Sequence, residues 1–242
     1  MRVRAVLFDL GGTLVDERDY DGWCEIARRF YLDLEPDLLR HAFLEVEAEV
    51  DAGTPRWDED GLADFWRRTL SRAAGREVDV VATRKFLSAV LENHRPFRLY
   101  SDTRRCLDTL RSERRALGVV SNSTSEASVR RILDEVGILD YFGRVVSSGT
   151  EGIAKPDPEI FRRAVERMAV RPEEAVFVGN LARTDAKAAE AAGLHGVWLN
   201  REGFGYGEDP IEITSLLEVP LAVRRIEREA DARRTPRAGG AR

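Results

Sequence analysis

A carboxylate at the end of a buried strand is the first feature of this sequence that could carry chemistry. The apolar run Val3–Phe8 predicts a strand, and Asp9 follows it directly, with Gly11 and Gly12 shortly afterwards. Because glycine has no side chain, a ligand can approach the backbone closely at such a turn. The same residue types are also common in ordinary turns. The segment alone therefore leaves a structural turn and a reactive carboxylate both open.

Polar side chains recur at similar places further along the chain. Ser121 and Asn122 end an apolar run, where they could bind a ligand or cap a helix. Lys155 precedes a helical pattern in a chain whose other cations are nearly all arginine, which favours a site that needs a compact charge. Asn180 and Asp185 follow another run. Such oxygen ligands suit a hard cation such as Mg²⁺, although an Asp there can also cap the next helix.

The elements that must position these residues alternate along the chain. Strands are predicted at Val3–Phe8, Ala116–Val120, Ala175–Val178 and Gly196–Leu199, with a weaker one at Arg144–Val146. Helices are predicted near Asp102–Glu113, Ser125–Val136, Pro158–Met168 and Asp185–Ala192. This alternation predicts an α/β fold, a doubly wound parallel sheet with helices on both faces. Ligands of such sheets bind beyond the carboxyl ends of the strands, which is where the polar residues fall.

A helical segment interrupts the alternation after the first strand. Its helices are predicted at Trp23–Leu32, Pro36–Val50, Asp60–Ala74 and Val80–Glu92. We therefore divide the chain into an α/β core (1–16 and 96–220), an inserted all-helical cap (17–95) and a helix end with a flexible tail (221–242). The cap aromatics could line a substrate pocket, but packing between helices is the commoner role. They are Trp23, Trp57, Phe65 and Trp66.

Composition narrows the class of protein. The chain has 242 residues, 43% of them hydrophobic, and a formal net charge of −5, which argues against a nucleic-acid partner. No run of 18 apolar residues and no secretory leader is present, so we expect a cytoplasmic protein without a membrane partner. Cys24 and Cys106 are expected to be two unrelated thiols, and the histidines form no zinc pattern. The oligomeric state stays open.

Taken in order, these segments resemble the four motifs of the haloacid dehalogenase (HAD) superfamily of hydrolases. The resemblance covers about residues 4–200, and the insertion matches the family's C1-type cap in position and size. It implies a Rossmann-like core and the chemistry of a phosphatase. The matching segments are Asp9-x-x-x-Thr13, Ser121-Asn122, Lys155-Pro-Asp-Pro and Gly179-Asn-x-x-x-x-Asp185.

The resemblance also implies a role for each of these residues. Asp9 would attack phosphorus and form an aspartyl-phosphate, which splits one difficult displacement into two easier ones. A second group would orient the phosphoryl oxygens of the substrate and neutralise charge: Thr13, Ser121, Asn122 and Lys155. A third group would hold Mg²⁺, in part through a backbone carbonyl: Asp9, Gly11, Asn180 and Asp185.

The sequence departs from the family pattern at two positions. Gly11 stands where the family's phosphatases carry the aspartate that acts as general acid and base, and Asn180 replaces the first acid of the fourth motif. A positioned acid/base contributes about 10²–10⁴-fold in rate. Asp16, Glu17 or a cap residue could replace it, and spacing favours none of them.

We therefore expect a Mg²⁺-dependent phosphatase of a small phosphorylated molecule, with weakened turnover. One alternative is a catalytically impaired relative that binds a phosphorylated ligand or a protein partner. Another is a 2-haloacid dehalogenase. Family dehalogenases also lack the second aspartate, but they usually have an aromatic residue in place of Gly11 and a tighter fourth motif. Cleavage of carbon–phosphorus bonds would need a cap lysine, and the neighbours of Lys85 give it no support.

Overall fold

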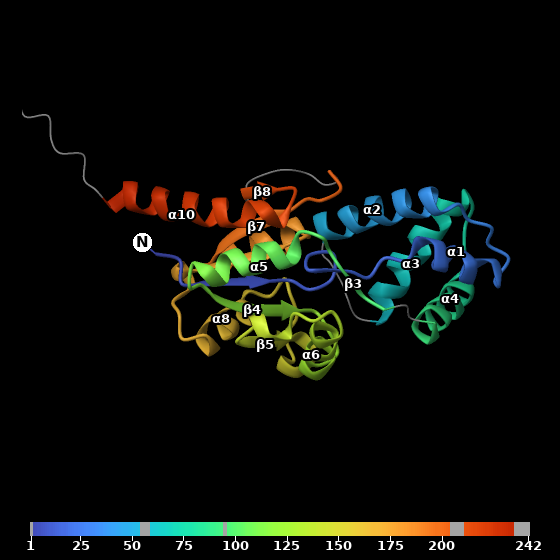
Figure 1. Ribbon diagram of the computed structural model, residues 1–242. Coiled ribbons are helices and arrows are strands. Elements are labelled where there is room, and N and C mark those ends of the chain that lie inside the picture. Colours follow the sequence, from blue (N-terminus) through green and yellow to red (C-terminus); the bar gives the residue numbers. More distant parts are fainter. Residues whose placement is uncertain (1, 54–58, 94–95, 204–210, 235–242) are drawn as a thin grey trace, which may run out of the picture.

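The protein consists of a sheet-based half and a helical half that lie end to end (Figure 1). The computed structural model describes residues 2–53, 59–93, 96–203 and 211–234. Trp57 and the end of the C-terminal tail (235–242) lie outside the described residues. Within the described residues no helix is both long enough and apolar enough to cross a membrane.

The core is a six-stranded parallel sheet. Its strands are β1 (Ala5–Phe8), β4 (Ala116–Ser121), β5 (Arg144–Ser147), β6 (Ala175–Gly179), β7 (His195–Leu199) and β8 (Ile211–Ile213), arranged in the order β5-β4-β1-β6-β7-β8. The predicted fold class is confirmed, with β1 in the middle of the sheet between β4 and β6. β8 was not predicted because three residues at an edge carry too little pattern.

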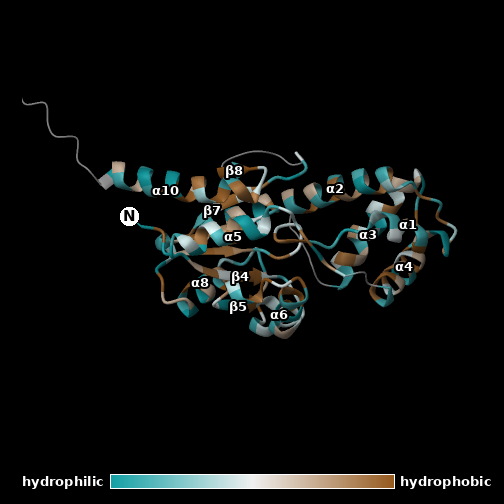
Figure 2. Cartoon of the chain, viewed as in Figure 1, coloured by the Kyte–Doolittle hydropathy of each residue, from teal (hydrophilic) through white to brown (hydrophobic). Residues whose placement is uncertain are grey.

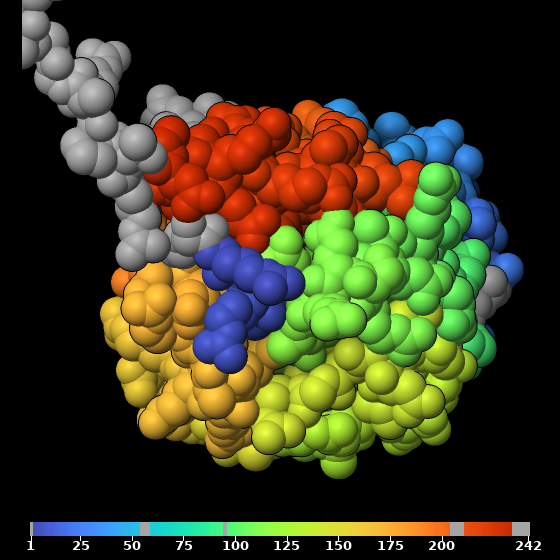
Figure 3. Space-filling view, turned by 60° about the vertical axis from the view of Figure 1, so that its left-hand side comes forward, coloured from blue at the N-terminus to red at the C-terminus, as the bar shows by residue number. Residues whose placement is uncertain are grey.

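Helices cover both faces of the sheet. One face packs against α5 (Thr103–Ser112), α6 (Glu126–Glu135) and α10 (Val219–Arg234), and the other against α8 (Pro158–Arg167) and α9 (Ala188–Ala191). Side chains along β1 alternate between these two cores, as the period of a strand requires. Figure 3 shows α10 in red directly above the green segment that holds α5, with the blue start of the chain below the red and beside the green.

Short elements complete the core domain. They are α7 (Ser148–Glu151), η1 (Leu139–Tyr141), η2 (Pro172–Glu174) and η4 (Leu216–Glu218). The helix predicted over Asp185–Ala192 is in fact a π-helical turn, η3 (Ala182–Lys187), that continues into α9. π-turns of this kind are rare and occur frequently at functional sites.

The inserted segment forms four helices at one end of the molecule: α1 (Tyr20–Arg28), α2 (Pro36–Ala52), α3 (Glu59–Ala74) and α4 (Val80–Glu92). Their hydrophobic sides turn inward, and both hydrophilic and hydrophobic residues occur along each helix (Figure 2). Trp23, Phe65 and Trp66 are buried in this small core, where Trp23 and Trp66 meet edge to face with ring centroids 4.9 Å apart. These aromatics therefore pack the helices together.

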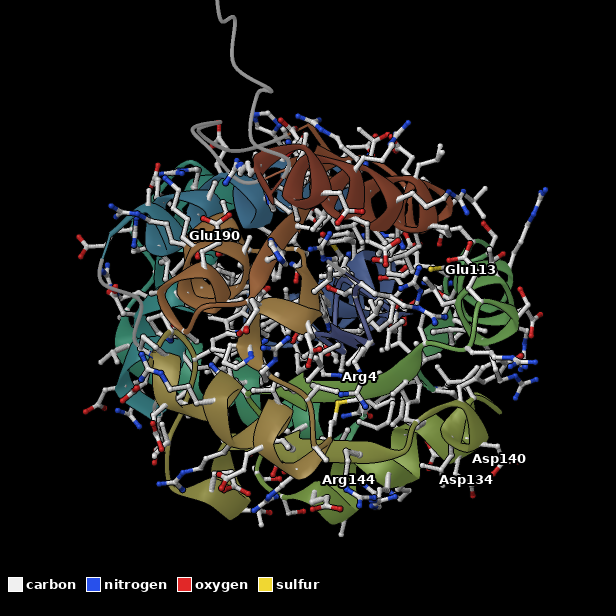
Figure 4. All side chains as sticks on the ribbon, turned by 90° about the vertical axis from the view of Figure 1, so that its left-hand side faces the viewer. Arg4, Glu113, Asp134, Asp140, Arg144 and Glu190 are labelled. Atoms are coloured by element: carbon white, nitrogen blue, oxygen red, sulfur yellow. The ribbon has the colours of Figure 1, made fainter. Side chains whose placement is uncertain are left out.

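The two linkers between the halves pair with each other. β2 (Val15–Asp16) runs antiparallel to β3 (Arg98–Leu99), so the chain enters and leaves the helical half at one place. The helical half lies beyond the carboxyl ends of the parallel strands. Arg4 and Arg144 lie at the opposite, amino ends of the strands (Figure 4). Arg4 directly precedes β1, and Arg144 is the first residue of β5.

Candidate active site

A lysine between two aspartates lies at the carboxyl edge of the sheet. Lys155 Nζ is 2.6 Å from Asp9 Oδ1 and 2.6 Å from Asp185 Oδ1. Asp9 follows the end of β1 and Asp185 lies in η3 after β6, whereas Lys155 comes from the loop before α8. Only 3% of the Lys155 surface is exposed. Three residues from separate predicted motifs therefore form one buried cluster.

The cluster holds one cation and two carboxylates. Burial alone would lower the pKa of Lys155, but the charges of Asp185 and Asp9 raise it above its ordinary value. Burial raises the pKa of Asp185, and the charge of Asp9 adds to that effect, while Lys155 opposes it. Because two carboxylates share the ammonium group, we take Lys155 as charged. The pKa of Asp185 is raised chiefly because its carboxyl group is buried, and the single cation, shared with Asp9, does not cancel that effect.

Both oxygens of Asp185 are engaged. Oδ1 faces Lys155, and Oδ2 accepts a hydrogen bond from the backbone N–H of Leu181 at 3.0 Å. A Cβ atom at Gly179 would lie 2.4 Å from the Asp185 carboxyl group. The Asp185 side chain can occupy this position only because residue 179 is a glycine. Asp185 thus fixes Lys155 relative to the end of β6.

Thr13 connects the first and fourth motifs. Its hydroxyl lies 3.2 Å from Asp9 Oδ2 and 3.4 Å from Asn180 Oδ1. Gly12 has a φ of +71°, and a Cβ atom there would lie 2.7 Å from the Asn180 amide nitrogen, so glycine permits this close approach. A hydroxyl has one proton and cannot donate to both oxygens at once. Asp9 and Asn180 therefore present neighbouring oxygens of the kind that a hard cation binds.

The side chain of Asn122 binds the backbone of Lys155. Its amide nitrogen donates to the carbonyl of Lys155 at 2.9 Å, and its carbonyl oxygen accepts from the N–H of Lys155 at 2.8 Å. The side chain thus fixes the backbone of Lys155 and orients the lysine. The neighbouring Ser121 is buried at the carboxyl end of β4, the strand beside β1.

Glu17 was not singled out by the sequence, but it lies beside the site. A Cβ atom at Gly11 would lie 2.6 Å from its Oε1 atom. Glu17 is an exposed residue, yet the surrounding protein desolvates its carboxyl group. This desolvation, together with the charge of Asp9, raises the pKa of Glu17 to about 7. No spacing rule could have found Glu17, since its position depends on how the chain turns after β1.

A second network holds the loop that contains Thr13. Asp102 accepts two hydrogen bonds from the Arg201 guanidinium, at 2.8 and 2.9 Å, and a further one from Ser215 Oγ at 2.8 Å. Arg201 in turn donates to the carbonyl oxygen of Thr13 at 3.0 Å and stacks over the Tyr100 ring. Sequence analysis missed this network, because its members are far apart along the chain.

A cavity of about 670 Å³ lies between helix α2 and the carboxyl edge of the sheet. Charged and polar side chains from both halves line it, including Arg18, Glu47, Asp51, Asn180, Arg183 and Arg201. Glu47 forms an ion pair with Arg18 at 3.1 Å, and burial raises the pKa of Glu47. A small polar molecule could therefore be enclosed beside the site by groups of both halves.

Asp51 of α2 binds the helical half to the core. One of its oxygens accepts from the N–H of Arg183 at 2.8 Å, and the other accepts from the N–H of Thr184 at 2.8 Å and its hydroxyl at 2.6 Å. Arg183 also donates to the carbonyl oxygen of Ala52 at the end of α2. The end of α2 and the start of η3 thus bind each other reciprocally.

We expect Asp51→Ala to lower the free energy of unfolding by about 2–4 kcal/mol, because buried donors lose their acceptor. Asp51→Asn keeps one acceptor oxygen, so its free energy of unfolding should lie between those of Asp51→Ala and the wild type. Urea unfolding measures both, and Asp37→Ala on the exposed side of the same helix is the control. Equal stabilities of the Asp51→Ala and Asp37→Ala variants would show that this contact contributes little.

Comparison of the whole sequence with known protein families identifies one family that matches this chain. The profile of the haloacid dehalogenase-like hydrolases matches residues 3–193. The chain belongs to this family. Its phosphoglycolate phosphatase relative from Nitrosospira multiformis is 30% identical over 90% of this chain and 92% of that protein. The (S)-2-haloacid dehalogenase 2 of a Pseudomonas species is 26% identical over 89% of this chain and 93% of that protein.

The structure is likewise similar to solved members of the family. A HAD phosphatase from Thermococcus onnurineus has a TM-score of 0.59 and 28% sequence identity, covering 92% of this chain and 98% of that one. The family therefore includes phosphatases and dehalogenases that resemble this chain over nearly its whole length. The choice between these two chemistries depends on the site itself.

Proposed function

We propose that this hydrolase is a phosphatase of a small phosphorylated molecule and that Asp9 forms an aspartyl-phosphate during the reaction. The observation that carries the proposal is the buried contact of Lys155 with both Asp9 and Asp185. A lysine in this position contacts the carboxyl group of the nucleophile and holds it at the end of β1. The same charge lies where the oxygens of an incoming phosphoryl group would gather.

The proposal assigns a task to each group around Asp9. Asp9 Oδ2 attacks phosphorus, and Thr13 orients that oxygen through its hydroxyl. Lys155 neutralises charge on the nucleophile and on the phosphoryl group. Ser121 contributes a hydroxyl donor from the end of β4, and Asn122 acts through the backbone of Lys155 unless it exchanges those bonds for substrate.

Magnesium fits this set of donors with fewer carboxylates than a fully acidic site would offer. Asp9, Asn180 and the backbone carbonyl of Gly11 would hold the ion. Asp185 would join them only by giving up its contact with Lys155 or Leu181. Once bound, Mg²⁺ would neutralise charge that develops on the phosphoryl oxygens. Because an amide replaces one acid at Asn180, we propose that the ion binds weakly.

The helical half would act as a C1-type cap over the site. Two observations support this assignment: Asp51 binds the end of α2 to the core, and the cavity beneath α2 is lined by Gly12 and Asn180 of the site. Enclosure by a cap excludes water from a phosphoryl-transfer site and commits the substrate. The cavity volume and its polar lining suit a small, charged molecule.

Rapid-quench kinetics with 4-nitrophenyl phosphate test the proposal. In Mg²⁺ we expect a burst of 4-nitrophenol equal to the enzyme concentration, followed by slower turnover, because the aryl leaving group needs little protonation. EDTA should remove the burst, and added Mg²⁺ should restore it. If neither release of 4-nitrophenol nor an acid-stable phosphoprotein is detected at any Mg²⁺ concentration, the phosphatase proposal is wrong.

Two other candidates make different predictions in the same experiment. A dehalogenase is favoured by the relative from Pseudomonas and by the absence of a second aspartate at Gly11. It would release halide from 2-chloropropionate with no phosphoenzyme. A catalytically impaired phosphate-binding protein is also favoured by Gly11. It would be stabilised thermally by phosphate esters and would hydrolyse none of them.

A further inference from the structure

A carboxyl group occupies the space beside Gly11, the position that carries no side chain. A Cβ atom at Gly11 would lie 2.6 Å from Oε1 and 2.8 Å from Oε2 of Glu17. A side chain at position 11 would therefore begin where the carboxyl group of Glu17 already lies. The site lacks an acid at Gly11 in sequence but has a carboxyl group next to it in space.

The fold of the first loop brings these two residues together. After β1 the backbone turns, and the N–H of Gly12 donates to the carbonyl oxygen of Val15 at 2.9 Å. Gly11 and Val15 also form a β-bridge. β2 (Val15–Asp16) then passes Gly11, and Glu17 is the next residue. The backbone therefore places Glu17 beside the loop that begins at Asp9.

Glu17 is exposed, and its carboxyl group forms no hydrogen bond or ion pair within the part of the chain that the structure describes. Its neighbours differ in this respect. Asp16 accepts a hydrogen bond from the N–H of Arg18 at 3.1 Å and faces Arg98. Glu47 is paired with Arg18 at 3.1 Å. Among these three acids, Glu17 alone is placed to exchange a proton with a bound molecule.

We propose that Glu17 is the general acid and base of this enzyme and takes over the proton transfer for which Gly11 has no side chain. The inference rests on the phosphatase function proposed above. Glu17 would then be a catalytic residue located in the linker between the core and the cap. The segment of chain that connects the cap would also carry out the proton transfer.

Each half of the reaction balances with Glu17 in this role. In the first half, an oxygen of Asp9 bonds to phosphorus, the bond from phosphorus to the leaving oxygen breaks, and Glu17 gives its proton to that oxygen. In the second half, Glu17 takes a proton from water, the water oxygen bonds to phosphorus, and the bond between phosphorus and Asp9 breaks. Glu17 ends protonated and Asp9 ends free, so only phosphate ester and water are consumed.

The test compares Glu17→Gln with the wild type on 4-nitrophenyl phosphate and phenyl phosphate. With 4-nitrophenyl phosphate, phosphorylation of Asp9 should stay within a few-fold of the wild type, because 4-nitrophenolate leaves without a proton. Hydrolysis of the phosphoenzyme should slow by about 10²–10⁴-fold, so labelled protein accumulates. With phenyl phosphate, phosphorylation itself should slow as well. KM should change little in both cases.

Two further variants separate a chemical role from a structural one. Glu25→Gln makes the same change on the exposed side of α1 and should leave both steps unchanged. Gly11→Asp added to Glu17→Gln should restore much of the lost hydrolysis, because it returns a carboxyl group to the same space. The backbone at Gly11 lies outside the left-handed region, so an aspartate there meets no backbone strain. The exposed side chain at position 17 must turn aside to make room for it.

The outcomes distinguish this proposal from the phosphatase function. If the wild type forms a phosphoenzyme but Glu17→Gln hydrolyses it at the same rate, Glu17 is not the acid/base, and the phosphatase function stands. An equal loss of phosphorylation with both substrates, without rescue by Gly11→Asp, would assign Glu17 a structural role and also overturn the proposal. If the wild type forms no phosphoenzyme, the phosphatase function itself fails.

Discussion

Replacing Asp9 with asparagine should lower turnover of 4-nitrophenyl phosphate by about 10⁴-fold or more, the scale on which enzymes lose rate when the nucleophile is removed. An amide oxygen is a poor nucleophile, and the aspartyl-phosphate cannot form. The phosphoryl adduct on the peptide that contains Asp9 should be absent after acid quench. Asn has nearly the same size and keeps an oxygen near Lys155 and Thr13, so the fold should survive.

The matched control for this change is Asp134→Asn. Asp134 is exposed near the end of α6, and Figure 4 shows it on the side of the molecule that faces away from the cap. It should keep wild-type burst and turnover. If Asp9→Asn still gave a stoichiometric burst of 4-nitrophenol, another residue would be the nucleophile. Mass spectrometry of the quenched protein would then locate it.

Replacing Lys155 with methionine should have a large effect on both activity and stability. The variant leaves Asp9 and Asp185 facing each other without a cation in a buried site. Removing one partner of a buried ion pair costs about 3–5 kcal/mol of unfolding free energy. Turnover should fall by about 10³-fold or more, since the phosphoryl group loses a preorganised positive charge.

The stability loss in Lys155→Met should depend on pH in a defined direction. Burial and Asp9 already raise the pKa of Asp185, and removal of Lys155 raises it further. An acid with a raised pKa in the folded state binds its proton more tightly there, so it favours folding at low pH. That benefit disappears as pH rises through the raised pKa. The loss relative to wild type should therefore be greatest above pH 8 and shrink towards pH 5.

Urea unfolding at several pH values in EDTA measures this dependence without competition from metal. Lys85→Met on the exposed side of α4 is the control and should change stability by less than about 0.5 kcal/mol. A stability loss in Lys155→Met that is the same at pH 5 and pH 8 would mean that Asp185 does not titrate in this range. The electrostatic account of the cluster would then be wrong.

The sequence by itself determined the fold class and predicted which polar residues lie at one edge of the sheet, for a simple physical reason. Parallel strands end at one edge of a sheet, so Asp9, Ser121 and Asn180 could be placed together once their strands were identified. The helices of the insertion were recognisable because their apolar residues repeat with the period of a helix. In contrast, β2 and β8 have two and three residues, too few for a pattern.

The tertiary structure decided what individual side chains do within that site. Asn122 has the residue type of a ligand-binding group, yet its amide binds the backbone of Lys155, because the two loops happen to meet there. Asp185 contacts Lys155, a pairing that the sequence did not predict. Such hydrogen bonds form only when loops far apart in sequence are placed relative to each other to within a few tenths of an ångström. No local sequence pattern encodes that placement.

Glu17 is the clearest example of the difference between what the sequence determines and what the tertiary structure decides. The sequence determined that Gly11 lacks an acidic side chain and that several acids occur nearby. Only the turn after β1 decided which of them reaches Gly11, because that turn returns the chain past its own beginning. A missing group in a motif can be read from sequence, whereas its replacement in space depends on the path of the backbone.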